Sequence, residues 1–178
     1  MTVRDVLQYP HPSLRDVANP ITQAEVSSGF LTQLVSDMLE TMYATPGTVG
    51  LAAPQIGQAW QVFVMDATAS SSRERCRVVV NPVMESQSKW KYGREGCLSF
   101  PDYLITIKRA RKISTRYWDA HFSEQHEEFS DFEAVIFQHE WDHLGGILFI
   151  DLAKNLEADL TLRSEYHQQV NKEASSTG

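Results

Sequence analysis

The segment that most constrains this chain is His139-Glu140-Trp141-Asp142-His143, which lies in a strongly apolar run at residues 132–144. Ser130 or Asp131 can cap this run and Gly145-Gly146 ends it, so a helix is predicted. Histidines four residues apart project from one helix face, and their imidazoles can converge on one metal ion. Unpaired imidazoles and a buried carboxylate would be costly in an apolar helix. The pattern therefore favours a metal-binding helix over two surface histidines.

Glu140 follows the first histidine and is badly placed to be a further ligand. It can instead reach a water molecule on the metal and take its proton. A catalytic metal normally has three protein ligands and one open position, so a third ligand must come from elsewhere. A further histidine six residues after His143 is ruled out, because Phe149 stands there. Glu157 or Glu165 could serve, as in a zinc endopeptidase.

Cys97 is the stronger candidate for the third ligand. Gly96 frees the backbone beside it, and the positive charge of Arg94 favours the thiolate. A lone cysteine is more often a small buried apolar residue, which is what we expect of Cys76 in its valine-rich strand. Thiolate and imidazole together suit either zinc or iron. The residues alone therefore predict a metal-dependent hydrolase.

The remaining sequence predicts one long helix, several short strands and a second helix. Apolar residues at three- and four-residue steps predict a helix over 23–44, capped by Thr22 and ended by Pro46-Gly47. Residues 48–57 are interpreted as a small-residue loop. The strands are expected at 61–66, 76–81, 89–92, 104–108 and 113–118, with a polar turn at 67–75. A charged, weakly amphipathic helix is expected at 154–173.

These elements predict an α+β fold, with antiparallel sheets wrapped around a central metal-binding helix and with an N-terminal and a C-terminal helix. A chain of 178 residues without an internal repeat or a linker suits one domain, residues 1–178. The net charge of −7 disfavours a nucleic-acid partner. No apolar run approaches the ~20 residues that span a bilayer, and no secretory signal is recognised. With two cysteines, a reducing cytoplasm is expected.

Three segments together resemble the peptide deformylase family. They are Gly50-Leu51-Ala52-Ala53-Pro54-Gln55, Glu95-Gly96-Cys97-Leu98-Ser99 and Gln138-His139-Glu140-Trp141-Asp142-His143, and their order and spacing match as well. The resemblance extends outward and covers roughly residues 3–152, whereas residues 155–178, a helix and tail, carry no signature. It implies hydrolysis of the formyl group from the N-terminal formylmethionine of newly made polypeptides. Nascent chains are then the expected partners, with proximity to the ribosome.

The resemblance also assigns residues. It implies that Cys97, His139 and His143 bind one divalent ion, typically ferrous iron, with zinc or another divalent metal able to take the site. The side-chain amide of Gln55 and the backbone N–H of Leu98 are expected to stabilise the negative charge on the formyl oxygen. Gln55 could instead only brace its loop. Two further residues, Glu95 and Arg109, match a charged pair that braces the cysteine loop, while the role of Asp142 stays open.

The substrate is expected to lie along small residues. Val49-Gly50-Leu51 can pair with an extended peptide as an added strand, and Gly50 allows close approach of its backbone. Gly96 is a further candidate contact. The methionine side chain needs an apolar pocket, for which the candidates on the metal face of the helix are Phe132, Val135 and Ile136. Core packing is the alternative for Phe132.

Two positions depart from the family pattern. Thr48 stands where the family usually has a glycine, and Leu104 stands where some members carry an arginine near the cleft. Either could alter substrate preference or rate. Besides the zinc endopeptidase, a second alternative is therefore an inactive deformylase-like protein that binds formylated peptides.

Overall fold

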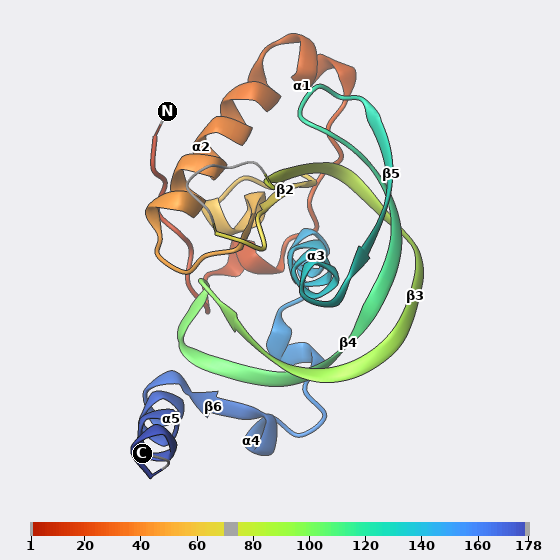
Figure 1. The fold of residues 1–178 in the computed structure, drawn as a ribbon. Helices are drawn as coiled ribbons and strands as arrows, with labels where there is room; N and C mark the ends of the chain where they lie inside the picture. Colours follow the sequence, from red (N-terminus) through yellow and green to blue (C-terminus); the bar gives the residue numbers. More distant parts are fainter. Residues whose placement is uncertain (1, 70–74, 177–178) are drawn as a thin grey trace.

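The computed structural model describes residues 2–69 and 75–176, with side chains as far as Lys172. Within these ranges one six-stranded antiparallel sheet curves around helix α3 (Asp131–Leu144), which lies in its hollow (Figure 1). The sheet has the order β1-β2-β3-β4-β5, and β6 pairs with β4. Its strands are β1 (Gly50–Ala52), β2 (Val62–Met65), β3 (Arg77–Cys97), β4 (Phe100–Trp118), β5 (Glu124–Ser130) and β6 (Leu160–Leu162). The predicted α+β fold around a central helix is confirmed, with its strands joined in one sheet.

The N-terminal helix is broken, whereas we predicted one helix over 23–44. It consists of α1 (Gln23–Ser27) and α2 (Phe30–Ala44), and Gly29 between them has φ +79°, a left-handed conformation that ends a helix. Thr22 caps the first of these helices, α1, as predicted, and it also forms a capping box with Glu25. No helix in the described ranges has the length and apolarity needed to cross a membrane.

The strands are longer than predicted. The separate strands expected at 76–81 and 89–92 are one strand, β3, and those expected at 104–108 and 113–118 are one strand, β4. In the sequence, the polar residues on the outer face of this long ribbon are typical of turns, so each long strand was predicted as two short ones. Register shifts between Val80 and Val83 and between Met84 and Ser86 let the ribbon bend around α3. Part of the predicted turn at 67–75 lies outside the described residues.

Two further segments differ from prediction. Residues 48–57 contain β1 and a 3-10 helix, η2 (Ala53–Ile56), rather than a plain loop. The helix expected at 154–173 is instead α4 (Leu156–Asp159), β6 and α5 (Arg163–Ser176). The β6 backbone finds partners on β4 from Tyr103 to Ile105, which sequence periodicity cannot reveal. Two other 3-10 turns, η1 (Pro12–Arg15) and η3 (Phe149–Leu152), complete the described elements.

The core lies between α3 and the sheet. Phe137 of α3 packs edge-on against Phe63 of β2, with ring centroids 5.0 Å apart, and also against Phe129 of β5. Ser130 occupies the N-cap position of α3 but makes no side-chain cap bond, and Gly145 ends the helix. Because α3 is packed by the sheet on several sides, the two histidines in its C-terminal half, His139 and His143, are buried in a fixed position.

Candidate active site

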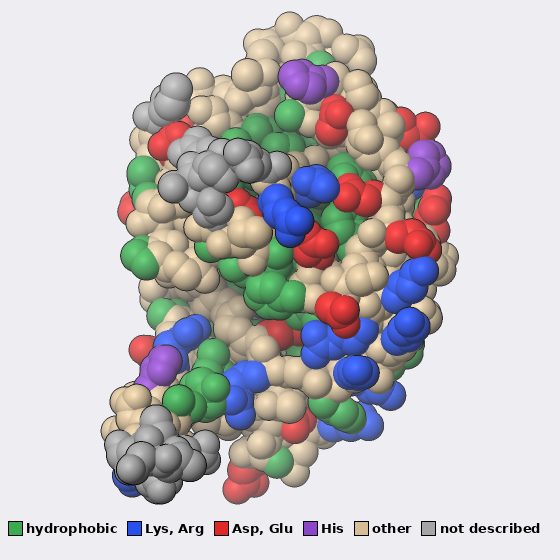
Figure 2. Space-filling view, viewed as in Figure 1, with side chains coloured by type: hydrophobic (Ala, Val, Ile, Leu, Met, Phe, Trp, Pro, Cys, Tyr) green, Lys and Arg blue, Asp and Glu red, His purple; other side chains and the backbone are tan. Residues whose placement is uncertain are grey.

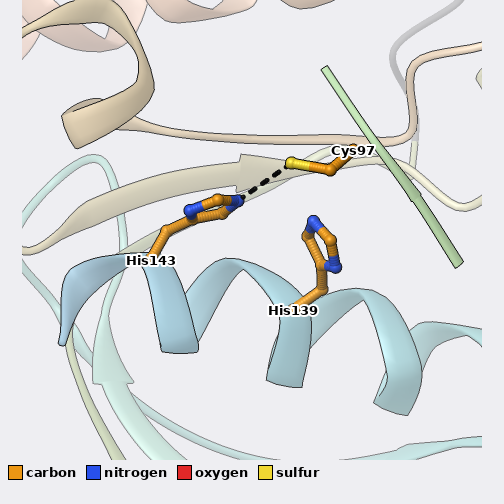
Figure 3. Close-up of side chains that lie close together, drawn as sticks. All are labelled: Cys97, His139 and His143. Atoms are coloured by element: carbon orange, nitrogen blue, oxygen red, sulfur yellow. Dashed lines mark hydrogen bonds between the residues drawn. The ribbon is translucent and has the colours of Figure 1, made fainter. Parts of the chain in front are cut away.

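Cys97, His139 and His143 lie together, with one candidate ligand atom from each residue within 4.8 Å of the other two. Cys97 ends β3, and both histidines project from α3 toward its sulfur (Figure 3). The Cys97 Sγ is 3.3 Å from Nε2 of His143. Ligand atoms around one zinc or iron ion lie about 3–4 Å apart, given metal–ligand bonds of about 2.0–2.3 Å. The separation of Cys97 and His143 lies in this range, and one thiolate and two imidazoles are a donor set that suits zinc or iron, so the three residues could hold one such ion.

A buried ionic network orients His139. Its Nδ1 is 2.9 Å from Oε2 of Glu95, which leaves Nε2 facing Cys97 and His143. Arg109 donates two hydrogen bonds to Glu95, at 2.9 and 3.1 Å. Burial alone would raise the pKa of Glu95, but His139 and the Arg109 charge outweigh it and lower the pKa to about 2. Glu95 is thus a carboxylate that fixes the ring of His139.

Arg109 also donates to Asp142, which lies one residue before His143 on α3. All three members of the network, Glu95, Arg109 and Asp142, are buried. Sequence reasoning left Asp142 without a role, and the structure places its carboxylate between α3 and β4. Burial holds the pKa of His143 well below its ordinary value, so its ring is neutral and can offer a lone pair.

Glu140 is 4% exposed and has a carboxylate oxygen, Oε2, without a hydrogen-bond partner within the described ranges. Burial raises its pKa to about 7. Gly50 of β1 passes directly over this carboxylate, because a Cβ built on Gly50 would lie 2.4 Å from Oε1. A carboxyl group in this position can accept and donate a proton near neutral pH.

Gln55 is held in η2 by both ends of its amide. Its Oε1 accepts from the backbone N–H of Ala52 at 2.9 Å, so it does brace its loop. Its Nε2 faces Cys97 Sγ at 3.5 Å and Ser99 Oγ at 3.3 Å. Leu98 lies in the short turn between β3 and β4, next to Cys97. The Gln55 N–H₂ group and the Leu98 turn are therefore both adjacent to the candidate metal ligands.

A cavity of about 500 Å³ opens beside these residues. Four buried residues of the site line it: Gln55, Cys97, His139 and Glu140. The substrate-binding candidates that line it are Val49, Gly50, Gly96, Phe132, Val135 and Ile136. Phe132 is 52% exposed, which excludes simple core packing. Hydrophobic side chains are visible in the middle of the face shown in Figure 2.

Leu51 differs from the other substrate-binding candidates. Its side chain is fully buried in the cluster beneath α2 and does not line the cavity. Alternate residues of a strand point to opposite faces, so Leu51 faces inward next to Gly50. Any contact of Leu51 with a peptide is therefore limited to its backbone.

The sequence model of the polypeptide deformylase family matches residues 3–159. The chain belongs to this family. The peptide deformylase of Rhizobium meliloti is 39% identical over 92% of each chain. A solved peptide deformylase of Legionella pneumophila superposes with a TM-score of 0.80 at 32% identity, over 99% of this chain and 98% of that one. A class I type b peptide deformylase of Acinetobacter baumannii was solved with Met-Ala-Ser bound. It superposes with a TM-score of 0.77 at 31% identity, over 85% of this chain and 99% of that one.

Family membership makes the chain an enzyme, a hydrolase that removes the formyl group of formylated polypeptides.

Both residues that depart from the deformylase pattern, Thr48 and Leu104, lie in the cavity wall. Thr48 is buried, and its Oγ1 has no hydrogen-bond partner in the described part of the chain. Leu104 packs close to Gly96, and Arg163 of α5 lies beside both. The strand β6 brings Arg163 to the cavity wall. Its one signal in the sequence is the alternation Leu160-Thr161-Leu162, which is too short to predict a strand.

Gly50→Ala is expected to lower deformylase turnover about 10²-fold, since a shift of about 1 Å in a catalytic group costs that much. The new Cβ would meet Oε1, Cδ and Cγ of Glu140 at 2.4, 2.9 and 3.0 Å, so the carboxylate must move. The measurement is formate release by the metal-loaded variant. Gly145→Ala is the control, because its Cβ would meet no atom closer than 3.4 Å and lies outside the cavity. Equal turnover in the two variants would contradict the expected displacement of Glu140.

Proposed function

We propose that this chain removes the formyl group from the N-terminal formylmethionine of newly made polypeptides and releases formate, with Glu140 as its acid–base group. The observation that carries the proposal is the convergence of Cys97, His139 and His143 beside a buried carboxylate at the inner end of one cavity. This arrangement supports hydrolysis of a small amide, because a polarised water and a proton carrier can both act on it.

Cys97, His139 and His143 would hold one divalent ion, which we propose to be Fe²⁺, with Zn²⁺ or another divalent metal as the alternative. The donor set of one thiolate and two imidazoles suits both metals. The neutral ring of His143 and the orientation of His139 by Glu95 support binding through ring nitrogens. When bound, the ion would act as a Lewis acid that lowers the pKa of a water molecule and polarises the formyl oxygen.

Glu140 would move the protons of the reaction. Its carboxylate accepts a proton from the attacking water as the oxygen bonds to the formyl carbon. It then gives that proton to the departing nitrogen as the carbon–nitrogen bond breaks, so formate and a free α-amino group result. The pKa near 7 supports both transfers, and Gly50 gives the carboxylate room beside the substrate.

Gln55 and Leu98 would stabilise the charge that develops on the formyl oxygen. The Ala52 N–H fixes the Gln55 carbonyl oxygen, so the amide N–H₂ end is turned toward Cys97. The backbone N–H of Leu98 belongs to the turn next to Cys97. Donors placed in advance stabilise a transition state without reorganisation, and one such donor is worth about 10²–10³ in rate.

The peptide would lie along β1. This strand is at one edge of the sheet and pairs with β2 on its other side, so an extended peptide can add to the backbone of residues 49–51. Val135 and Ile136 would form the buried wall of the methionine pocket, with Phe132 at its open side. The tripeptide Met-Ala-Ser in the Acinetobacter structure supports a peptide of this kind.

The same proposal extends to setting. Formylated nascent chains leave the ribosome in the cytoplasm, where we expect this enzyme to act near it. We further propose that residues 1–178 form one domain, since α5 contacts β4 as well as β6.

The proposed function predicts formate release from formyl-Met-Ala-Ser by the protein prepared without air and loaded with Fe²⁺. Cys97→Ala is expected to lose tight metal binding and formate release together. A zinc endopeptidase would instead use Glu157 or Glu165, and both are exposed and outside the three-residue group. Retained tight metal binding by Cys97→Ala would support the endopeptidase. Full metal loading of the wild type without formate release would support the inactive peptide-binding alternative.

A further inference from the structure

Three arginines line the cavity that holds Glu140. Arg94 comes from β3, Arg111 from β4 and Arg163 from α5, so three distant segments place guanidinium groups around one opening. We call these three residues the arginine rim. No carboxylate of the described residues forms an ion pair with any of them. The positive charge of these arginines contrasts with the net charge of −7 of the whole chain.

Arg163 is the best positioned of the three. Its Nε donates to the carbonyl of Pro101 at 2.9 Å, and pairing of β6 with β4 fixes the backbone just before it. Its Nη2 would lie 2.6 Å from a Cβ on Gly96, so the guanidinium covers the backbone next to Cys97. Arg163 therefore lies beside the candidate metal site. The family pattern covers residues 3–159, and Arg163 lies after them.

The other two arginines are also held in place. The guanidinium of Arg94 stacks on Tyr166 of α5, with its carbon 4.1 Å from the ring centroid. Arg111 approaches Gly93 and donates to the carbonyl of Tyr92 at 3.4 Å, while its buried Nε has no partner within the described ranges. Held cations lose little conformational entropy when an anion binds to them.

The carboxylates that face the same cavity do not neutralise the rim. Glu95 is already paired with Arg109 and His139, and Glu140 lies under Gly50 at the inner end. Figure 2 shows most of the Lys and Arg side chains of this face in its lower half, over the β3–β4 ribbon and toward the C-terminal segment, with others near its middle. The three arginines of the rim are therefore cationic side chains of the cavity lining that pair with no carboxylate of the described residues.

We propose that Arg163, together with Arg94 and Arg111, selects formylated peptides that carry an acidic side chain shortly after the formylmethionine. This inference rests on the proposed function and adds a substrate preference to it. A carboxylate near the rim is attracted by several positive charges in a partly desolvated cleft, which strengthens binding and speeds association. The contact is the same in the ground state and the transition state, so it affects KM rather than kcat.

The test is formate release from three amidated peptides, formyl-Met-Ala-Glu, formyl-Met-Ala-Gln and formyl-Met-Ala-Lys, at low ionic strength. The amide ends remove the terminal carboxylate as a competing anion. Wild type is expected to favour Glu over Gln about three- to tenfold in kcat/KM, as a few partly exposed charge pairs allow. Arg163→Gln should lose most of this preference through KM while keeping its kcat on the Gln peptide. Arg163→Lys should keep part of it.

Lys172→Gln is the matched control, since it removes one positive charge from the same helix, α5, outside the cavity. It should behave as wild type, and Arg163→Glu should favour the Lys peptide. Equal kcat/KM for all three peptides in wild type, or the same fold-loss on each in Arg163→Gln, would overturn the inference while leaving the proposed function intact. If metal-loaded wild type deformylates none of them, the proposed function fails. Calorimetry then measures the affinity of each of the same peptides. Equal affinities for the Glu, Gln and Lys peptides would overturn the proposed preference of the arginine rim.

Discussion

Glu140→Gln is expected to lower formate release by about 10²–10⁴-fold, the range that a positioned general acid–base group contributes. Glutamine has nearly the same shape as glutamate, so it can occupy the space under Gly50 without a clash. It cannot take a proton from water or return one to the departing nitrogen. The loss should therefore appear in kcat, because the lost contribution arises in the transition state.

Metal binding and stability separate this effect from damage to the site. Glu140 is outside the ligand group, so metal content should equal that of wild type. A neutral side chain also removes a buried carboxyl group with an unpaired oxygen, so thermal stability should be unchanged or higher. The measurements are formate release, metal content and the unfolding midpoint of both proteins. Turnover within about tenfold of wild type would show that another group moves the proton.

The histidine helix could be predicted because its information is local. Four-residue spacing fixes the relative directions of His139 and His143 on any helix, and apolar neighbours show that the helix is buried. Cys97 was the stronger candidate for the third ligand because of its neighbours Gly96 and Arg94. Only the family pattern assigned it as a ligand, since no local rule brings the end of β3 to α3. The structure adds a reason for the pairing: Gly96 stays free of a side chain where Arg163 and Leu104 approach.

Other parts could not be predicted because they depend on partners distant in the sequence. The polar outer residues of β3 and β4 resemble turns until their pairing across the long ribbon is known. Residues 160–162 resemble a helix until β4 supplies hydrogen bonds to them. The role of Asp142 stayed open because its partner, Arg109, comes from another element. Charges that pair across elements leave no periodic signal.

Arg109→Met is expected to destabilise the protein by about 3–5 kcal/mol, the cost of removing one partner from a buried ionic group. Arg109 is 5% exposed and is the shared cation of two buried carboxylates, Glu95 and Asp142. Methionine can fill much of the space but leaves both carboxylates without their counter-ion. His139 would also lose a firmly held partner, so metal affinity should fall about 10- to 100-fold.

Arg116→Met provides the matched control, because it removes an arginine from the same strand, β4. Arg116 pairs with Glu124 at 3.1 Å in a partly exposed position, and such pairs contribute only about 0–1 kcal/mol. Denaturant unfolding of each metal-free protein gives the stabilities, and metal titration gives the affinities. A loss of under about 1 kcal/mol in Arg109→Met would mean that the network contributes no more than a surface pair.

A triple variant separates charge from packing. Arg109→Met combined with Glu95→Gln and Asp142→Asn removes every charge of the network while keeping similar volumes. Buried ionic groups replaced as a whole are often no less stable than the original, whereas half-removed groups are costly. The triple variant should therefore regain much of the stability that Arg109→Met loses. Its metal affinity should stay low, because a neutral Gln at position 95 is a weaker acceptor for the Nδ1–H of His139. Recovery of stability without recovery of metal binding would assign the network to orienting His139 rather than to holding the fold.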